Sequence, residues 1–520
     1  MKNNILYNKE KFYVFFIFIF AIIVNQYYGN KGVFPVDSFS HFDSGFRILL
    51  GEFPFKDYWI VSGPIIDYFQ SIFFYFLGVN WQAYVFHASF INAILSVSTF
   101  LIFRNFNLNI NYSLIYSLFF SILAYPVSGT PFVDHHSAFF SLLGVYSLIL
   151  GIKNEKKINW ILLPIFFSFA FLSKQVPSMY VIVSAILILA FFSIFKKKYY
   201  WIKYSSISLA LLILLLLFFG KVSEISLSSF IEQYILYPQT IGVQRIKDIN
   251  LSGIFIHFKF IFFALAPLLF INLKKLIIEK DYFRKNDFYY FLILVLFVSS
   301  LIFHQILTKN QIFIFFLIPI LFAFSHIYLK PAENNFNIIS LILVSICLFA
   351  TIKYHIRFNE NRKFHELNNV NFELSLNGSR IDKKLSGLQW ITPGYKNNPK
   401  KEIILINKIK SHLLSDGRNK ILITNYSFFS TILGKSSFSP SRWYHQDGTD
   451  FPMENNKYFT KYKDLLINII ENNDIDVIYT IYPQESSIIY TYIDQNCFAE
   501  KRISEMLNSY ELRDCDEINN

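Results

Sequence analysis

Long apolar stretches alternate with short polar ones over the first 350 residues of the chain. A helix that crosses the roughly 30 Å core of a bilayer needs about 17–25 mostly apolar residues. The pattern therefore predicts an α-helical polytopic membrane protein with about eleven transmembrane helices. We expect them at residues 12–28, 82–103, 110–125, 136–152, 159–173, 176–195, 201–220, 252–272, 288–308, 311–329 and 337–353.

The number of spans depends on one break in the pattern. The polar residues Ser173, Lys174 and Gln175, followed by Pro177, separate the stretches 159–173 and 176–195. We interpret the two stretches as two separate helices, because their combined length is too great for a single span. The first stretch lacks a small-residue cleavage site, so we interpret it as a retained span.

Lysine and arginine residues predict the orientation of the spans. They gather in alternate loops, for example at Lys153, Lys156 and Lys157 and at Lys196 to Lys198. Cytoplasmic loops carry such an excess, so the N-terminus is expected to be cytoplasmic. An odd number of spans then places the C-terminal tail on the outer side.

The tail differs from the rest of the chain. Apolar runs shrink to strand length at Lys420–Thr424 and Val477–Ile481, and a helical pattern at Tyr458–Glu471 lies between them. This arrangement is typical of an α/β domain. We therefore expect a transmembrane module at residues 1–352 and a soluble periplasmic domain at residues 353–520. The first long outer loop, residues 30–80, adds two aromatic helix-like segments, 39–50 and 65–77, which suit helices lying in the membrane interface.

Composition and charge agree with a membrane protein. Hydrophobic residues make up 53% of the chain, charged residues only 16%, and the mean hydropathy is +0.37. Such values exclude a disordered chain and argue against a wholly soluble enzyme. The net charge of +12 would suggest nucleic acid as a partner in a soluble protein. Because much of the basic excess lies in the inside loops, we expect membrane lipids and no nucleic acid.

The three cysteines fall into two groups. Cys347 lies inside the last span, where a small buried hydrophobic residue is the simple interpretation. Cys497 and Cys515 both lie in the tail. A disulfide between them would require an oxidising compartment and would contribute about 3 kcal/mol. Two free thiols are the alternative.

Acidic residues avoid the spans and gather in the outer loops. Asp37, Asp43 and Asp57 lie in the first loop, and Asp134 lies in the second. A carboxylate at the mouth of a helical bundle can take a proton from an acceptor hydroxyl. The structural alternatives are that Asp37 and Asp134 cap the helices that follow them, and that Asp43 and Asp57 are solvated loop residues.

Histidines and cations complete the set of candidate residues. His135 and His136 are adjacent, so they point to different faces of a helix, and we predict no metal site there. The sequence does not decide whether the protein uses a divalent cation elsewhere as a cofactor. A departing phosphate needs cationic or hydrogen-bonding groups. The candidates are Lys174, Arg245 and Lys309, with His304 and Gln305 at the outer end of the span 288–308. A snorkelling lysine and an ordinary solvated arginine are the alternatives.

A basic and aromatic cluster, Arg442-Trp443-Tyr444-His445, lies in the tail. It has the composition of a site that holds an acceptor. A structural loop is the interpretation that we favour.

The first outer loop resembles a known family. Asp37 is followed by an aromatic-rich helix, Gly51, the stretch Pro54-Phe-Lys-Asp57-Tyr-Trp59, Pro64 and an aromatic run to Gly78. This order is similar to the first periplasmic loop of GT-C superfamily glycosyltransferases, such as lipid A aminoarabinose transferases and protein O-mannosyltransferases. The resemblance implies that Asp37 is the catalytic carboxylate, that Asp134 organises the site and that Lys174 lies near the donor phosphate. The chain departs from the family at Ser38, where an acid is frequent, and at Val61-Ser62-Gly63, where many members have lysine.

The resemblance implies a glycosyltransferase of the bacterial inner membrane. It would move a sugar from a polyprenyl-phosphate donor to a hydroxyl of a glycan, lipid or protein acceptor on the periplasmic face. Two other classes stay open: a transporter or flippase of a lipid-linked saccharide, and a membrane-anchored sensor or assembly factor. Transporters tend to have inverted repeats and ionisable residues at the bilayer midplane. Here no repeat is evident, and the ionisable residues lie mostly at span ends.

Overall fold

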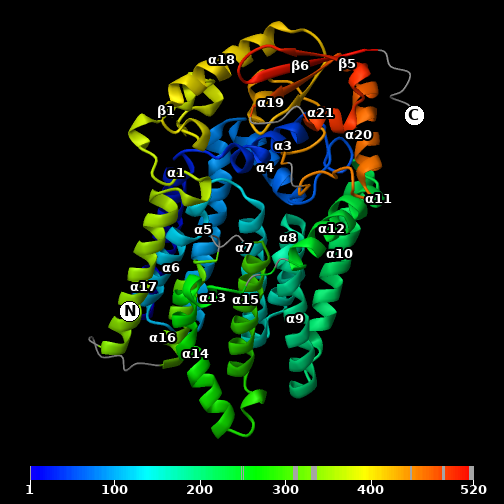
Figure 1. Ribbon diagram of the computed structural model, residues 1–520. Helices are drawn as coiled ribbons and strands as arrows, with labels where there is room; N and C mark the ends of the chain where they lie inside the picture. The colour runs from blue at the N-terminus through cyan, green and yellow to red at the C-terminus, as the bar shows by residue number, and fades with distance from the viewer. Residues whose placement is uncertain are drawn as a thin grey trace. The chain divides into compact units, whose positions relative to one another are not determined.

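The computed structural model describes residues 2–247, 249, 251–308, 314–329, 337–445, 448–482 and 487–513 (Figure 1). Contacts between residues divide the chain into two compact units. Unit 1 contains Met1–Gly29, Val85–Leu216 and Asp248–Phe364. Unit 2 contains Asn30–Tyr84, Leu217–Lys247 and His365–Asn520.

Unit 1 is made of apolar helices. Within the described ranges, nine helices are long and apolar enough to cross a membrane, and two shorter apolar helices accompany them. Each predicted span corresponds to one of these eleven, so the polytopic helical fold is confirmed. They are α1 (Lys2–Gly29), α5 (Trp81–Asn105), α6 (Ile110–Leu123), α7 (Val133–Asn154), α8 (Lys157–Ser173), α9 (Gln175–Lys196), α10 (Tyr200–Val222), α14 (Lys259–Ile278), α15 (Asn286–Thr308), α16 (Leu317–Leu329) and α17 (Ile338–Tyr354).

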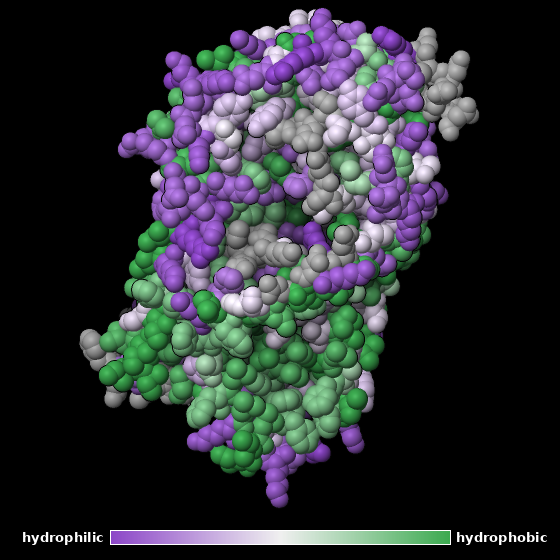
Figure 2. Space-filling view, viewed as in Figure 1, coloured by the Kyte–Doolittle hydropathy of each residue, from purple (hydrophilic) through white to green (hydrophobic). Residues whose placement is uncertain are grey.

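Burial separates the core helix of unit 1 from its surface helices. In the most apolar 18-residue stretch of α7, 94% of the residues are buried, whereas in that of α10 only 6% are buried. Gly144 and Gly151 of α7 let α8 approach closely, since a Cβ atom at either position would collide with Phe167 or Trp160. Figure 2 shows apolar side chains over the outer surface of the helices. Such a surface is suited to lipid.

Several span boundaries differ from the prediction. α1 begins at Lys2 instead of residue 12, and α16 begins at Leu317 after a turn at residues 314–316. The helix expected at 252–272 begins at Lys259, because Gly253 adopts a left-handed conformation (φ 77°) and a short helix, α13 (Ile254–His257), precedes it. The helix expected from residue 136 begins at Val133. The predicted break between α8 and α9 is confirmed, with Lys174 in an extended conformation between them.

Unit 2 combines helices from the first outer loop with an α/β tail. Its helices are α2 (Pro35–Ser38), α3 (Ser40–Leu49), α4 (Pro64–Leu77), α11 (Leu227–Phe230), α12 (Tyr237–Lys247), α18 (Pro399–Ser415), α19 (Phe428–Leu433), α20 (Phe459–Asn472) and α21 (Ser487–Tyr492). The main sheet has the order β3-β4-β6-β5, from Lys420–Ile423, Val477–Ile481, Leu507–Leu512 and Phe498–Arg502. β3 and β4 are parallel, and the other two pairs are antiparallel. The α/β tail is therefore confirmed.

Short elements connect these helices and strands. β1 (Leu376–Asn377) and β2 (Gln389–Trp390) form a small antiparallel pair. Two π-helical segments, Ile231–Leu236 and His355–Glu360, continue α11 and α17. The 3-10 turns lie at Tyr125–Val127, Tyr282–Arg284, Lys363–His365, Phe372–Leu374, Gly378–Arg380, Lys383–Leu385, Pro393–Tyr395 and Gln495–Cys497.

The core of unit 2 joins residues that are far apart in sequence. Trp59 and Val61 of the first outer loop pack in the same buried cluster as Ile421 and Ile478 of the sheet. The Trp59 amide also donates a hydrogen bond to the Pro440 carbonyl at 2.8 Å. Contacts thus group residues 30–84 with the tail, whereas a single cut after residue 352 assigns them to the transmembrane module.

The two loop helices differ in exposure. The first eight residues of α3 are all buried, so this segment is a core helix of unit 2. The expectation that it lies in a membrane interface is wrong, because packing within the unit covers its polar and apolar faces alike. The C-terminal end of α4 does expose Ile72, Tyr75, Phe76 and Leu77, as an interfacial segment would.

Candidate functional site

Asp37 lies in α2 of unit 2. It is the third residue of this four-residue helix and is half-buried. The capping position is occupied by Phe34, whose amide donates to the Ser38 hydroxyl at 3.0 Å. The alternative that Asp37 caps a helix from Ser38 is therefore wrong. Pro35 and the hydrogen-bonded Ser38 fix the backbone on both sides of the carboxylate.

Asp43 is buried inside α3, and its carboxylate accepts a hydrogen bond from the Ser430 hydroxyl of α19. Burial raises the pKa of Asp43 to about 7, although the nearby Arg47 guanidinium acts in the opposite direction. The solvated-loop interpretation is wrong for this residue. Because only 2% of Asp43 is exposed, we interpret it as a structural group and not as a group that contacts substrate.

The raised pKa of Asp43 predicts a pH-dependent stability. Between pH 4 and 7 the folded protein holds this proton, while the unfolded chain, with a value of 3.8, has released it. Stability should therefore fall as pH rises through this window, by at most about 4 kcal/mol, and level off above it. The Asp43→Asn variant should lose this slope and exceed the wild type in stability at pH 8. Thermal unfolding of unit 2 from pH 5 to 8 measures it, and equal slopes for both proteins would contradict it.

Asp57 closes the turn that follows α3. Its Oδ2 accepts a hydrogen bond from the Phe53 amide at 2.7 Å, and the residue is partly buried. Partial burial raises its pKa. The structure therefore gives Asp57 a local structural contact.

Sequence reasoning missed a buried charged cluster in unit 2. Arg442 Nη1 contacts Asp67 Oδ2 at 3.0 Å, and Nη2 donates to the Ser62 carbonyl at 2.6 Å. His41 Nδ1 lies 2.6 Å from Asp67 Oδ1, and burial with the nearby Arg442 lowers the pKa of His41 to about 4. The one hint in the sequence was Asp67, the single charged residue of the mostly apolar stretch 64–77, and it does not identify the partner. This geometry supports the structural interpretation of the cluster Arg442–His445.

Asp134 lies in unit 1, in the first turn of α7, and is buried. Its Oδ2 pairs with Lys174 Nζ at 2.7 Å, and its Oδ1 pairs with His304 Nε2 of α15 at 2.8 Å. The alternative that Asp134 serves only as a helix cap is wrong, because Phe132 holds the capping position. Three residues that the sequence analysis singled out separately therefore meet in one network.

Lys174 is the accessible member of this network. Its side chain is 21% exposed, whereas that of His304 is 1% exposed. One of its three ammonium hydrogens is directed to Asp134, and no other side chain in the described ranges takes the remaining two. The start of α9 adds no helix N-terminal anion site, because Val176 is extended (φ −122°, ψ 136°) and the regular helix begins only at Pro177, which has no N–H. This arrangement can bind a phosphate.

His135 and His136 both contact other side chains of unit 1. His136 hydrogen-bonds the Tyr125 hydroxyl and lies 3.1 Å from His87, Nε2 to Nε2. His135 stacks on the Tyr125 ring. In the part of the chain that the structure describes, no three His, Cys, Asp or Glu side chains are placed to hold a metal ion.

The remaining candidates are placed but not joined to the network. Arg245 lies in the last turn of α12 in unit 2 and is partly exposed. Cys347 is free and buried in α17, as predicted. Cys497 is buried at the end of a 3-10 turn, and Cys515 lies outside the described residues, so the disulfide stays a prediction. Lys309 also lies outside the described residues.

A family model matches part of the chain. Residues 61–222 match the model of the dolichyl-phosphate-mannose-protein mannosyltransferase family. The matched range includes Asp134 and Lys174 and begins after Asp37. No curated protein is similar enough to the chain to count as a match. The resemblance predicted from the first loop is confirmed over these residues, and together with the apolar helices it supports a membrane glycosyltransferase.

Proposed function

We propose that the protein transfers a sugar from a polyprenyl-phosphate donor to a hydroxyl group of an acceptor. The observation that carries the proposal is the network of Asp134, Lys174 and His304, two members of which lie in the matched range. A partly exposed lysine, held by Asp134 with two ammonium hydrogens to spare, suits the phosphate of such a donor.

The proposed reaction is a single displacement. The acceptor oxygen attacks the anomeric carbon while the bond from that carbon to the phosphate oxygen breaks, and the bonding pair leaves with the polyprenyl phosphate. Asp37 takes the proton of the acceptor hydroxyl. Lys174, with Arg245 as a second cation, stabilises the negative charge on the leaving phosphate. Attack from the face opposite the phosphate inverts the anomeric centre.

Asp134 and His304 are positioning residues in this proposal. Their contacts hold the lysine ammonium in one place. Because the ammonium group is already in position, the protein needs to rearrange less when negative charge develops on the phosphate in the transition state.

The proposed location is the bacterial inner membrane, with the reaction on the periplasmic face. The distribution of lysine and arginine over the loops supports this orientation. A glycan, lipid or protein hydroxyl serves as the acceptor.

Lys174 gives the first test. Purified protein in nanodiscs receives a radiolabelled polyprenyl-phosphate hexose, and released polyprenyl phosphate is measured. We expect Lys174→Gln to raise the KM for the donor about tenfold, since a charged hydrogen bond contributes about 1.5 kcal/mol or more. Lys174→Arg should retain more activity than Lys174→Gln.

The control for this test is Lys203→Gln, which removes an exposed lysine of α10. An unchanged donor KM in Lys174→Gln would contradict the assigned contact. If the wild type cleaves no polyprenyl-phosphate sugar, hexose or pentose, but moves it intact across a liposome membrane, the protein is a transporter and the proposal fails.

A further inference from the structure

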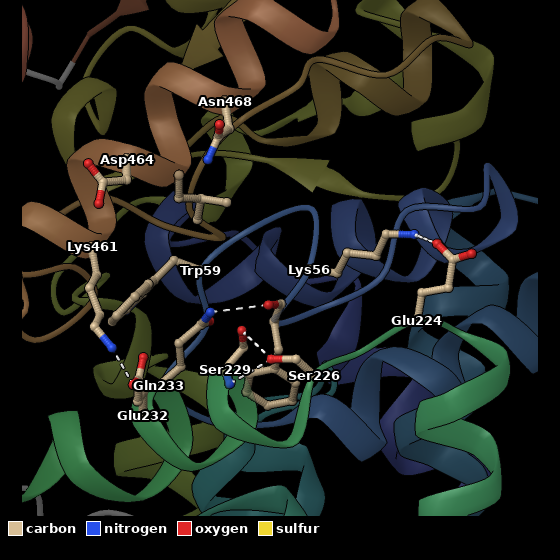
Figure 3. A pocket seen from close by; sticks show the side chains of 12 residues that line it. Lys56, Trp59, Glu224, Ser226, Ser229, Glu232, Gln233, Lys461, Asp464 and Asn468 are labelled. Carbon is tan, nitrogen blue, oxygen red and sulfur yellow. Dashed lines mark hydrogen bonds and ion pairs between the residues drawn. The ribbon is translucent and has the colours of Figure 1, made fainter. Parts of the chain in front are cut away.

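Unit 2 contains a polar pocket of about 330 Å³ (Figure 3). Its size falls in the range of small-molecule sites, about 300–1,000 Å³. Three parts of unit 2 form it: the turn around Phe55, the segment 224–233 and one face of α20. None of the residues assigned above to catalysis or phosphate binding lines it.

Two side chains of α20 offer free polar groups to the pocket. Asp464 and Asn468 lie one helical turn apart and are exposed. In the described ranges, neither side chain has a hydrogen-bond or ion-pair partner. The carboxylate accepts hydrogen bonds, and the amide both donates and accepts them. A ligand with several hydroxyl groups matches this combination.

The charges around the pocket argue against an anionic ligand. Lys461 pairs with Glu232 on one side, and Lys56 pairs with Glu224 at 2.7 Å on the other. Both lysines are therefore neutralised, and the Asp464 carboxylate adds a further negative charge. A phosphate or an acidic sugar would meet a repulsive field here. An apolar lipid chain would leave the polar groups without partners.

The pocket has a fixed floor. Phe55 adopts a left-handed conformation (φ 70°), which bulky residues rarely do. Gln233 holds this turn, since its side-chain amide donates to the Phe55 carbonyl at 3.2 Å and its oxygen accepts from the Ile60 amide at 3.1 Å. Strained backbone that the surrounding structure enforces is concentrated at ligand sites.

We infer that this pocket binds a neutral saccharide, namely the glycan part of the acceptor. The identification with the acceptor rests on the proposed function, whereas saccharide binding does not. Asp464 and Asn468 hold the sugar hydroxyls, and the buried rings of Phe55 and Trp59 form the apolar floor.

Saturation-transfer NMR on the full-length protein in nanodiscs tests the inference directly. The probes are the methyl glycosides of mannose, glucose, galactose and N-acetylglucosamine, together with lactose, maltose, glucuronic acid and glucose 6-phosphate. We expect at least one neutral sugar to bind and the two acidic sugars to give no signal. The double variant Asp464→Ala/Asn468→Ala should weaken binding at least tenfold.

A matched double variant on the same helix, Glu471→Ala/Asn472→Ala, also removes an exposed acid and an exposed amide, but outside this pocket, and should bind as the wild type does. The inference is overturned if no neutral sugar binds, if the acidic sugars bind better, or if both double variants bind equally well. Sugar binding that persists in a protein without transferase activity would overturn the proposed function and leave the pocket assignment standing.

Discussion

Replacing Asp37 by Asn should slow sugar transfer by about 10²–10⁴-fold, the usual contribution of a positioned general base. Asparagine keeps the size of the side chain but cannot take a proton. The KM for the donor should change little, because the proposed phosphate contacts come from other residues. Turnover of a radiolabelled polyprenyl-phosphate sugar by purified protein measures the effect.

The pH dependence separates a base from a merely structural acid. In the wild type, turnover should rise with pH as the base loses its proton, and Asp37→Asn should lack this rise. Asp37→Glu should recover part of the activity. The control is Glu373→Gln, which removes an exposed carboxylate of the tail. Full activity of a normally folded Asp37→Asn protein would show that another group takes the proton.

The membrane part of the fold was predictable from sequence because its signal is local. An apolar run of sufficient length predicts a span without reference to any other segment. The start of α7 was missed for the same reason. Asp134 and His135 are polar, so the pattern placed them before the helix, whereas their contacts with His304 and Tyr125 allow them to be buried within it.

Buried polar contacts between distant segments were not predictable. Arg442 and Asp67 are 375 positions apart, and each residue type is ordinarily exposed. A single sequence contains no signal for such a pairing. The expectation of an interfacial α3 failed because its aromatic residues also suit a core, and only the tail decides between the two.

The residues of the candidate site were predictable from the sequence, but their contacts with one another were not. Asp134, Lys174 and His304 were each recognised from residue type and from their position at the end of a span. Their meeting depends on how α7, α9 and α15 pack together. The residue types therefore suggested the phosphate site, and the packing of unit 1 provides its geometry.

The shared core of unit 2 affects the interpretation of a truncated protein. Removing the chain beyond about residue 360 would take away Ser430, Pro440 and Arg442, which bind residues of the first outer loop. That loop also contains Asp37. A truncated protein should therefore lose activity whether the tail is a sensor or part of an enzyme, so point variants are the better test.

Breaking the buried pair should cost unit 2 about 3–5 kcal/mol, the range for removing one partner of a buried ion pair. Arg442→Gln leaves the Asp67 carboxylate buried beside His41, without its guanidinium partner. Asp67→Asn combined with Arg442→Gln removes both charges and should cost less than the sum of the single variants. Hydrogen exchange over residues 40–77 measures the effect. Lys401→Gln breaks an exposed pair with Glu505 and should cost about 1 kcal/mol or less. Equal protection in Arg442→Gln and Lys401→Gln would mean that the buried pair does not hold the first outer loop to the tail.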